Sequence, residues 1–189
     1  MENKTTFFWF RRDLRLEDNV GLHHALKSSN NVQVLFIFDD DILSKLPRDD
    51  ARVSFIHNTL SNLNIQLNKK GASLLVKHGS PLSVWENLLN KFNIDSVYTN
   101  KDYEPYGMKR DIKVKSFLEQ KGVSFSSYKD QVIFEENQVV KNDGLPYTVY
   151  TPYKNKWLQK FDSKNDTDNY AITFENFSKN QFTMPSLNS

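Results

Sequence analysis

The sequence predicts an α/β domain built on a parallel β-sheet. Short apolar runs alternate with longer segments of helical periodicity along most of the chain, which is typical of βαβ units. Two of the helical segments also end alike, with lysine in the last turn followed by Gly71 in one and Gly122 in the other, as suits a left-handed helix cap. At 189 residues the chain has the size of one domain with a hydrophobic core of its own.

Five segments are predicted to be strands, because each is a short run of apolar or strand-favouring residues bounded by polar positions. They are Thr6–Phe10, Val32–Phe38, Ser73–Lys77, Ser96–Thr99 and Ser124–Tyr128. The helices predicted between them are Asn19–Ser28, Asp49–Lys70, Pro81–Phe92 and Glu104–Lys121. In the second helix, apolar residues recur at steps of three and four and so form one face. They are Val53, Ile56, Leu60, Leu63 and Leu67.

The alternation fades after Asp130. A turn is expected at Asn142–Gly144, and Thr151 and Pro152 are expected to be the N-cap and first residue of one more helix. From Asp162 onward the sequence is polar and aperiodic, which is typical of a linker or tail. We therefore divide the chain into an α/β domain, residues 1–161, and a linker, residues 162–189, and expect both to come from a longer protein.

The composition excludes several classes of function. The chain is 38% hydrophobic and 25% charged with a net charge of +2, so it lacks the strong basic field of a self-sufficient DNA-binding domain. It has no cysteine, which excludes disulfides, thiolate metal sites and cysteine nucleophiles. No apolar run is long enough to span a bilayer, and the first residues do not resemble a signal peptide. We expect a cytoplasmic protein with no membrane partner.

Charged segments follow three of the predicted strands. They read RRDLRLEDN after the first strand, DDDILSKLPRDD after the second and NKDYEPYG after the fourth. In a parallel sheet the carboxyl ends of all strands share one edge, and ligands bind there at the point where the strand order reverses. The expected order is 3-2-1-4-5, a three-layer, Rossmann-like arrangement with helices on both faces of the sheet. The sequence therefore predicts a binding crevice between the first and fourth strands.

These loops lack the residues of a catalytic or phosphate-cradling site. The glycine-rich fingerprints of dinucleotide and P-loop sites are absent. The run Asp39–Asp41 is a weak candidate for Mg²⁺, because consecutive residues at a strand end point in different directions, and the alternative is that these aspartates cap the next turn. The four histidines are not at ligand spacing. We expect no metal ion and no catalytic residue.

Four separated motifs nonetheless form a specific combination. In order, WFRRDLRLEDN, ARVSFIHNTLSNL, NKDYEPYGMKRD and YTVYTPYKNKW resemble the photolyase/cryptochrome family, and within it the bacterial cyclobutane-pyrimidine-dimer photolyases. The resemblance runs from about Thr6 to Phe161. It implies the N-terminal domain, which in this family holds a light-harvesting antenna chromophore. The larger, helical C-terminal domain of the family binds FAD and takes the lesion from UV-damaged DNA.

The resemblance implies that this chain is not catalytic alone. It would reach UV-damaged DNA only through the absent C-terminal domain, and we expect the 189 residues to be monomeric. Two other functions remain open: the same domain of a cryptochrome photoreceptor, and a free-standing nucleotide- or flavin-binding module. Downstream sequence, or a thymine-dimer repair assay on the intact protein, would separate them.

The resemblance also indicates which chromophore to expect. Relatives that hold methenyltetrahydrofolate carry Asn-Glu where this chain has Tyr106 and Gly107, so the folate pattern is broken. Relatives that hold FMN or a hydroxy-deazaflavin carry D-x-E-P-Y-G, which is present at positions 102–107. The residues matched to that flavin-type pocket are Arg12, Asp39, Arg52, Asp102 and Glu104. FMN or a hydroxy-deazaflavin is therefore the expected antenna, and in a host that lacks the dye the pocket stays empty.

The same residues suit a flavin-like ring on physical grounds. Phe10 and Phe38, at the ends of the first two strands, are expected to bury part of its flat apolar body. Carboxylates accept hydrogen bonds from ribityl hydroxyls or a ring N–H, and arginines meet a carbonyl edge or stack on the ring. Two structural alternatives remain. Arg12 and its neighbours in the first loop can pair with acids of that loop, and Glu104 can complement a helix N-terminus.

Overall fold

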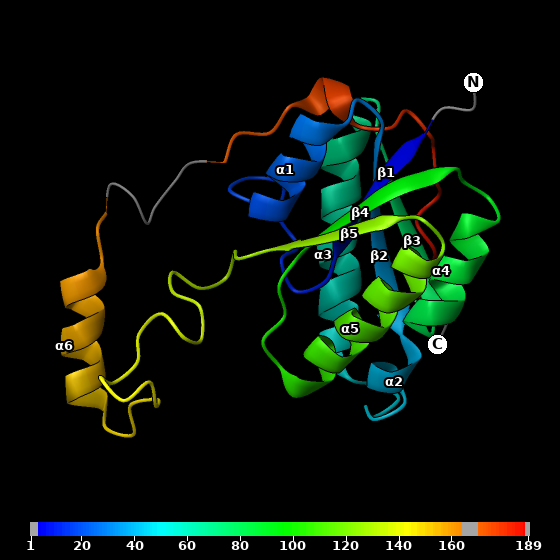
Figure 1. The fold of residues 1–189 in the computed structure, drawn as a ribbon. Coiled ribbons are helices and arrows are strands. Elements are labelled where there is room, and N and C mark those ends of the chain that lie inside the picture. Colours follow the sequence, from blue (N-terminus) through cyan, green and yellow to red (C-terminus); the bar gives the residue numbers. More distant parts are fainter. Residues whose placement is uncertain (1–3, 164–169, 188–189) are drawn as a thin grey trace.

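The structure, a computed structural model, describes residues 4–163 and 170–187. Within them the chain forms a five-stranded parallel sheet in the order β3-β2-β1-β4-β5, with helices on both faces (Figure 1). The predicted fold class and strand order are confirmed. No helix in the described ranges is long and apolar enough to cross a membrane.

The predicted strands and helices are all present, and their ends differ from the predictions by a few residues. The strands are β1 (Thr5–Phe10), β2 (Val32–Asp39), β3 (Leu74–Gly79), β4 (Ile94–Asn100) and β5 (Ser124–Tyr128). The helices are α1 (Val20–Ser28), α2 (Asp40–Leu43), α3 (Ala51–Asn68), α4 (Pro81–Leu89), α5 (Pro105–Gln120) and α6 (Tyr150–Lys160), with a 3₁₀ turn at Phe174–Asn176. The short helix α2 was not predicted.

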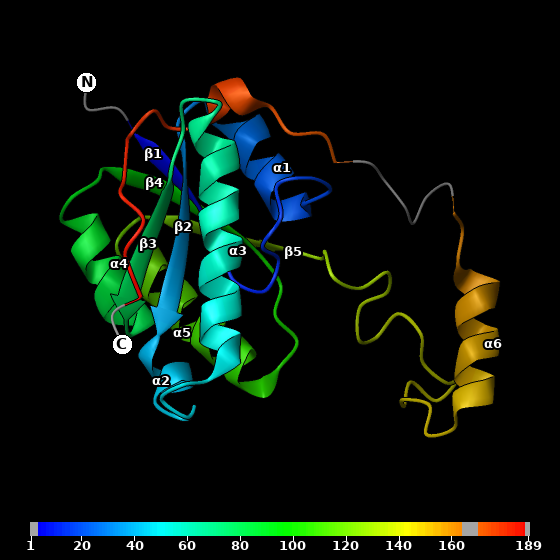
Figure 2. The same ribbon diagram turned by 180° about the vertical axis from the view of Figure 1, so that it is seen from behind.

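The sheet separates two hydrophobic cores. Helices α1 and α3 pack on one face, against Phe8 and Phe10 of β1, and α4 and α5 pack on the other, against Phe7 and Trp9 (Figure 2). Every residue of β1 is buried, because a central parallel strand is covered on both faces. The two predicted helix caps are also confirmed, since Gly71 and Gly122 have φ angles of 74° and 78°.

Beyond β5 the chain leaves the sheet, and α6 stands apart from the α/β body (Figure 1). The predicted turn is present, because Gly144 has a φ of 79° and its N–H donates to the carbonyl oxygen of Lys141 at 2.9 Å. The predicted start of α6 was wrong. The helix begins at Tyr150, its N-cap is Val149, and no side chain caps it, so Thr151 lies within the first turn.

Residues 170–187 return to the α/β body. Phe177 is 1% exposed and belongs to the core on the α1 and α3 side, and the N–H of Ser178 donates to the carbonyl oxygen of Val32 at 2.8 Å. Further along, the N–H of Phe182 donates to Oγ of Ser73 at 2.9 Å. These residues fall within the segment expected to be a linker, and there they have core and backbone contacts with the domain. The linker role of 162–189 stays a prediction.

Candidate cofactor site

A cavity of about 470 Å³ lies at the carboxyl edge of the sheet, between the ends of β1 and β2 and the first turns of α3 and α5. Its volume is in the range of small-molecule sites, about 300–1,000 Å³. Six of the seven residues that the sequence predicted for the site line it: Arg12, Phe38, Asp39, Arg52, Asp102 and Glu104. The three charged loops therefore meet at one cleft, as the strand order predicted. We call this space the chromophore cavity, after the role predicted for it from the sequence.

The seventh predicted residue, Phe10, does not line the cavity. Its side chain is 0% exposed, and its ring packs edge-on against Phe8 with centroids 4.8 Å apart. Trp9, the preceding residue, lines the cavity instead. Successive side chains of a strand point to opposite faces, so the position that meets a ligand depends on where the helices cover the strand end.

One wall of the chromophore cavity is apolar. Phe36 and Phe38 of β2 contact each other edge-on, with centroids 5.0 Å apart, and both line the cavity. Val53 and Ile56 of α3 complete this wall. The apolar face predicted for α3 therefore has two surroundings. Val53 and Ile56 line the cavity, and the three leucines that follow them on this face are buried in the core.

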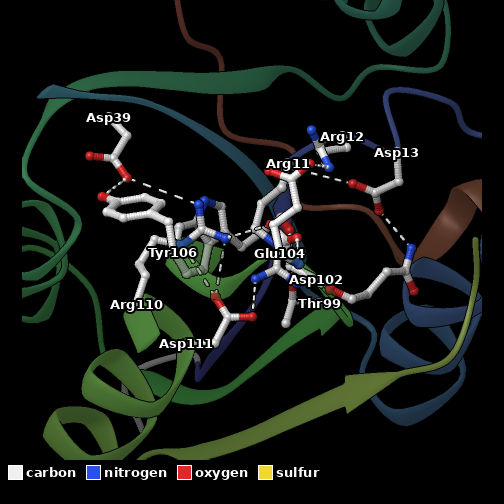
Figure 3. Close-up of polar contacts among 12 residues, drawn as sticks. Arg11, Arg12, Asp13, Asp39, Thr99, Asp102, Glu104, Tyr106, Arg110 and Asp111 are labelled. Atoms are coloured by element: carbon white, nitrogen blue, oxygen red, sulfur yellow. Dashed lines mark hydrogen bonds and ion pairs between the residues drawn. The ribbon is translucent and has the colours of Figure 1, made fainter. Parts of the chain in front are cut away.

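The opposite wall is charged, and its centre is Arg110 of α5. Its Nη2 atom lies 3.3 Å from Asp102 Oδ2 and 3.2 Å from Asp111 Oδ1, and its Nη1 lies 3.9 Å from Asp39 Oδ2 (Figure 3). The guanidinium also stacks over Trp9, 5.0 Å from the ring centroid. Only 9% of the Arg110 side chain is exposed. Arg110 therefore connects the ends of β2 and β4.

Arg110 was not among the residues predicted for the site, although it lies in the motif NKDYEPYGMKRD. The close approach of α5 to Asp102 places it. A Cβ added to Gly107 would lie 2.3 Å from the Asp102 carboxyl group, so only glycine allows this helix to come so near. Arg110 follows Gly107 by almost one helical turn and so faces the same carboxylates.

Arg11 is also buried beside this wall. Its side chain is 6% exposed, it forms an ion pair with Asp111, and its guanidinium lies 5.4 Å from the Trp9 ring centroid. Its backbone N–H donates to Asp13 Oδ1 at 2.9 Å. Its Nη2 atom is buried and has no hydrogen-bond partner among the described residues. The Arg11 guanidinium therefore pairs with an acid of α5, and the contact of Arg11 with an acid of its own loop is made by the backbone N–H.

Arg12 and Glu104 connect the loops after β1 and β4. Arg12 Nη1 donates to Glu104 Oε1 at 2.7 Å, and the two side chains are 56% and 62% exposed. An ion pair this exposed contributes at most about 1 kcal/mol, so either side chain can exchange its partner for a ligand at little cost. The basic first loop and the acidic fourth loop do face each other.

Arg52 lies at the mouth of the cavity and has a local partner. Its Nη2 atom is 2.6 Å from Oδ2 of Asp50, whose side chain also accepts the Arg52 backbone N–H as the N-cap of α3. These hydrogen bonds lower the pKa of Asp50 from 3.8 to about 2, and the bond from the Arg52 side chain has the larger effect. The Arg52 side chain is 69% exposed and can still turn toward a ligand.

The three consecutive aspartates after β2 have separate contacts. Asp39 caps α2 by accepting the Asp41 N–H at 3.0 Å, and its other oxygen accepts the hydroxyl of Tyr106 at 2.7 Å. Burial, and then this hydrogen bond, raise the pKa of Tyr106. Asp40 instead pairs with His78 at 2.7 Å. Capping, the alternative to a Mg²⁺ site, is therefore present, and the described residues contain no cluster of three or more acids or histidines arranged to hold a metal ion.

A larger hollow, of about 1210 Å³, lies at the other end of the sheet, where residues 175–180 cross the strand starts. Asparagines and lysines form much of its border, among them Asn31, Asn93 and Lys91. Parallel sheets bind their ligands at the carboxyl edge and not at the amino edge. The smaller chromophore cavity is therefore the candidate site.

Photolyases and cryptochromes are among the known proteins with similar sequences. A deoxyribodipyrimidine photo-lyase of Synechococcus sp. is 35% identical over 150 residues, which cover 79% of this chain and 31% of that protein. Cryptochrome-1 of Erithacus rubecula is 26% identical over 147 residues, which cover 77% of this chain and 24% of that protein. The chain thus spans about a third of the photolyase relative's length.

Solved structures give the same result. A class III photolyase from Agrobacterium tumefaciens matches with a TM-score of 0.77 and 29% identity, over 87% of this chain and 33% of that one. An archaeal photolyase from Sulfolobus tokodaii, solved with two FAD molecules, matches with a TM-score of 0.64 and 34% identity, over 72% and 32%. Residues 6–172 match the family described as DNA photolyase. With the shared fold, this match shows that the chain belongs to the DNA photolyase family.

Proposed function

We propose that this chain is the light-harvesting, cofactor-binding part of a deoxyribodipyrimidine photo-lyase, and that the chromophore cavity holds a flavin-type antenna, FMN or a hydroxy-deazaflavin. One observation carries the proposal: six of the seven residues predicted from the sequence line a single cavity that has one apolar and one charged wall. Residues 1–161 would form the antenna domain and 162–189 the connection to a helical, FAD-binding domain. Light-driven repair of pyrimidine dimers would belong to that larger protein and not to these 189 residues alone.

The two walls suit the two halves of a flavin. The flat ring would lie against Phe38 and Ile56, where each 100 Å² of buried apolar surface contributes about 2.5 kcal/mol. Ribityl hydroxyls or a ring N–H would donate to the carboxylates of Asp102 and Glu104. Arg12 would leave Glu104 to meet a ring carbonyl. No proton transfer is required, because an antenna needs only a fixed orientation and protection from water.

The buried ion pairs would provide that fixed orientation. Asp102 and Arg110 are each about nine-tenths buried and bonded to each other, so the charged wall cannot rearrange freely. The stacking of Arg110 on Trp9 adds a rigid aromatic support behind it. A dye against this wall would keep one orientation, which excitation transfer to a second cofactor depends on.

Absorption and fluorescence titration of the purified chain with FMN and a hydroxy-deazaflavin tests the site. We expect a sharpened or red-shifted band on binding, and an affinity loss of about tenfold or more in Asp102→Ala and Asp102→Asn, since a charge-assisted hydrogen bond is removed. Arg12→Ala should weaken binding as well. Lys4→Ala is the control, because it removes an exposed cation paired with Asp95 at the other edge of the sheet. Binding that is unchanged in all site variants would place the dye elsewhere.

Repair itself is tested on the complete gene product loaded with FAD. Under illumination, thymine dimers in a synthetic oligonucleotide should be converted back to monomers. We favour repair over the signalling role of a cryptochrome because the photolyase relative is 35% identical and the Cryptochrome-1 relative 26%. Dimers that persist under light would contradict the repair function and favour the photoreceptor.

A further inference from the structure

A second, smaller space adjoins the chromophore cavity. It has a volume of about 190 Å³ and lies between the first turn of α4 and the side of α5. Asp41, Tyr106 and Arg110 line both spaces, so the two meet at these side chains. We call this space the side cavity. A ligand that fills the chromophore cavity can therefore extend past Tyr106 into it.

The side cavity presents two lysines that lack an acidic partner. Lys109 and Lys113 lie one turn apart on α5, both line the cavity and both are exposed. Neither forms an ion pair within the part of the chain that the structure describes. By contrast, Lys115 on the same helix has Glu119 within 3.8 Å. Like charges four residues apart destabilise a helix, so this arrangement does not serve the helix itself.

The lining residues of the side cavity include one acid, Asp41, against three cations, Lys109, Arg110 and Lys113. Arg110 is already paired with Asp102 and Asp111. Asp41, the acid among the lining residues, lies 3.3 Å from the Tyr106 hydroxyl. The amino end of α4 adds a partial positive charge at the same place. The side cavity thus contains more positive than negative charge, which favours an anion.

We propose that the antenna chromophore of this chain ends in a phosphate group, and that Lys109 and Lys113 bind that phosphate in the side cavity. Because the ring must first lie in the chromophore cavity, this placement depends on the function proposed above. The ribityl chain would cross the Tyr106 hydroxyl and bring the phosphate between two lysine ammonium groups, each a mobile point charge suited to phosphate oxygens. Of the expected dyes, FMN has such a terminus, and riboflavin is the matched ligand without it.

Paired titrations of the full 189-residue chain with FMN and riboflavin, in phosphate-free buffer, test the proposal. The wild-type chain should bind FMN about 10- to 100-fold more tightly than riboflavin, as expected for charge-assisted contacts to phosphate. In the double variant Lys109→Ala/Lys113→Ala that preference should vanish, while the affinity for riboflavin stays unchanged. Lys115→Ala removes a charge from the same helix outside the side cavity and should keep the preference.

Two further measurements test whether the phosphate group causes the preference for FMN over riboflavin. Inorganic phosphate at millimolar concentration should compete with FMN and leave riboflavin binding unaffected. Added salt should reduce the preference for FMN, since exposed lysines are screened.

Each outcome is decisive. Equal affinity of the wild-type chain for both ligands overturns the phosphate proposal and leaves the flavin site standing. A preference that survives the double variant overturns the role of the two lysines. If neither flavin binds, the proposed antenna function fails, and the phosphate proposal fails with it.

Discussion

Arg110 and Asp102 form an ion pair at 3.3 Å in which 9% of one side chain and 10% of the other are exposed. The pair connects α5 to the loop that follows β4. Two charges so far removed from water depend on each other, because neither has solvent to replace its partner. Breaking such a pair from one side leaves an uncompensated buried charge and costs about 3–5 kcal/mol.

The first prediction concerns this pair. Arg110→Met keeps most of the side-chain length and removes the charge, so the free energy of unfolding should fall by about 3–5 kcal/mol in urea denaturation. Arg12→Met breaks the exposed pair with Glu104 and should cost less than about 1 kcal/mol. Equal losses in the two variants would show that burial does not distinguish these ion pairs.

Gly107 should tolerate no larger residue. A Cβ at this position would lie 2.3 Å from the Asp102 carboxyl group, so Gly107→Ala forces either the helix or the carboxylate to move. We expect a loss of about 1–3 kcal/mol in thermal or urea unfolding, although alanine favours a helix by about 1 kcal/mol over glycine. Flavin affinity should fall as well. Met108→Ala, at the exposed neighbouring position, should change neither quantity appreciably.

The N-cap of α3 should titrate in acid. The folded-state pKa of Asp50 is lowered from 3.8 to about 2 by its hydrogen bonds from Arg52, so the ionised form is favoured in the folded protein. Its contribution to stability is then present above pH 4 and is lost as the pH falls through about 2. Carboxyl ¹³C NMR should give the low midpoint, and Arg52→Gln should raise it toward 3.8. A midpoint that does not move in the variant would mean that the arginine side chain is not its cause.

Phe177 should contribute to stability as a core residue. It is 1% exposed, so Phe177→Ala should lower the free energy of unfolding by about 3–5 kcal/mol. Phe55→Ala is the matched control, because that side chain is 71% exposed. Denaturant titrations of the two variants compare the same substitution at a buried and at an exposed position. Similar results would mean that residues 170–187 do not pack on the domain in solution.

The sequence predicted the sheet order and the convergence of the loops because both follow from the alternation of apolar strands with helices. Parallel βα units leave few topologies, and these place the carboxyl ends of β1 and β4 together. Residues whose role depends on the direction in which the side chain points from its helix or strand were missed or misplaced. Arg110 faces Asp102 only because Gly107 lets α5 approach, and Phe10 faces the core because helices cover that side of β1.

The return of residues 170–187 was missed for a different reason. Their few apolar side chains follow no regular period, so the sequence of this segment resembles that of a linker that does not pack on the domain. Phe177 nonetheless fills a place in the core beside Val32, which no periodicity could indicate. Local patterns reveal a residue's environment only where the backbone is regular.

That return has a practical consequence for anyone who shortens the gene. A product trimmed at Phe161, where the composition changes, would contain all five strands. It would lack Phe177, whose side chain packs in the core beside Val32. The α/β body is thus discontinuous along the polypeptide, because residues 170–187 pack on it after the α6 excursion. Expression trials should therefore retain the residues through Phe182. If a product trimmed at Phe161 aggregates, the expected cause is the core surface left uncovered beside Val32, and not the loss of a bound chromophore.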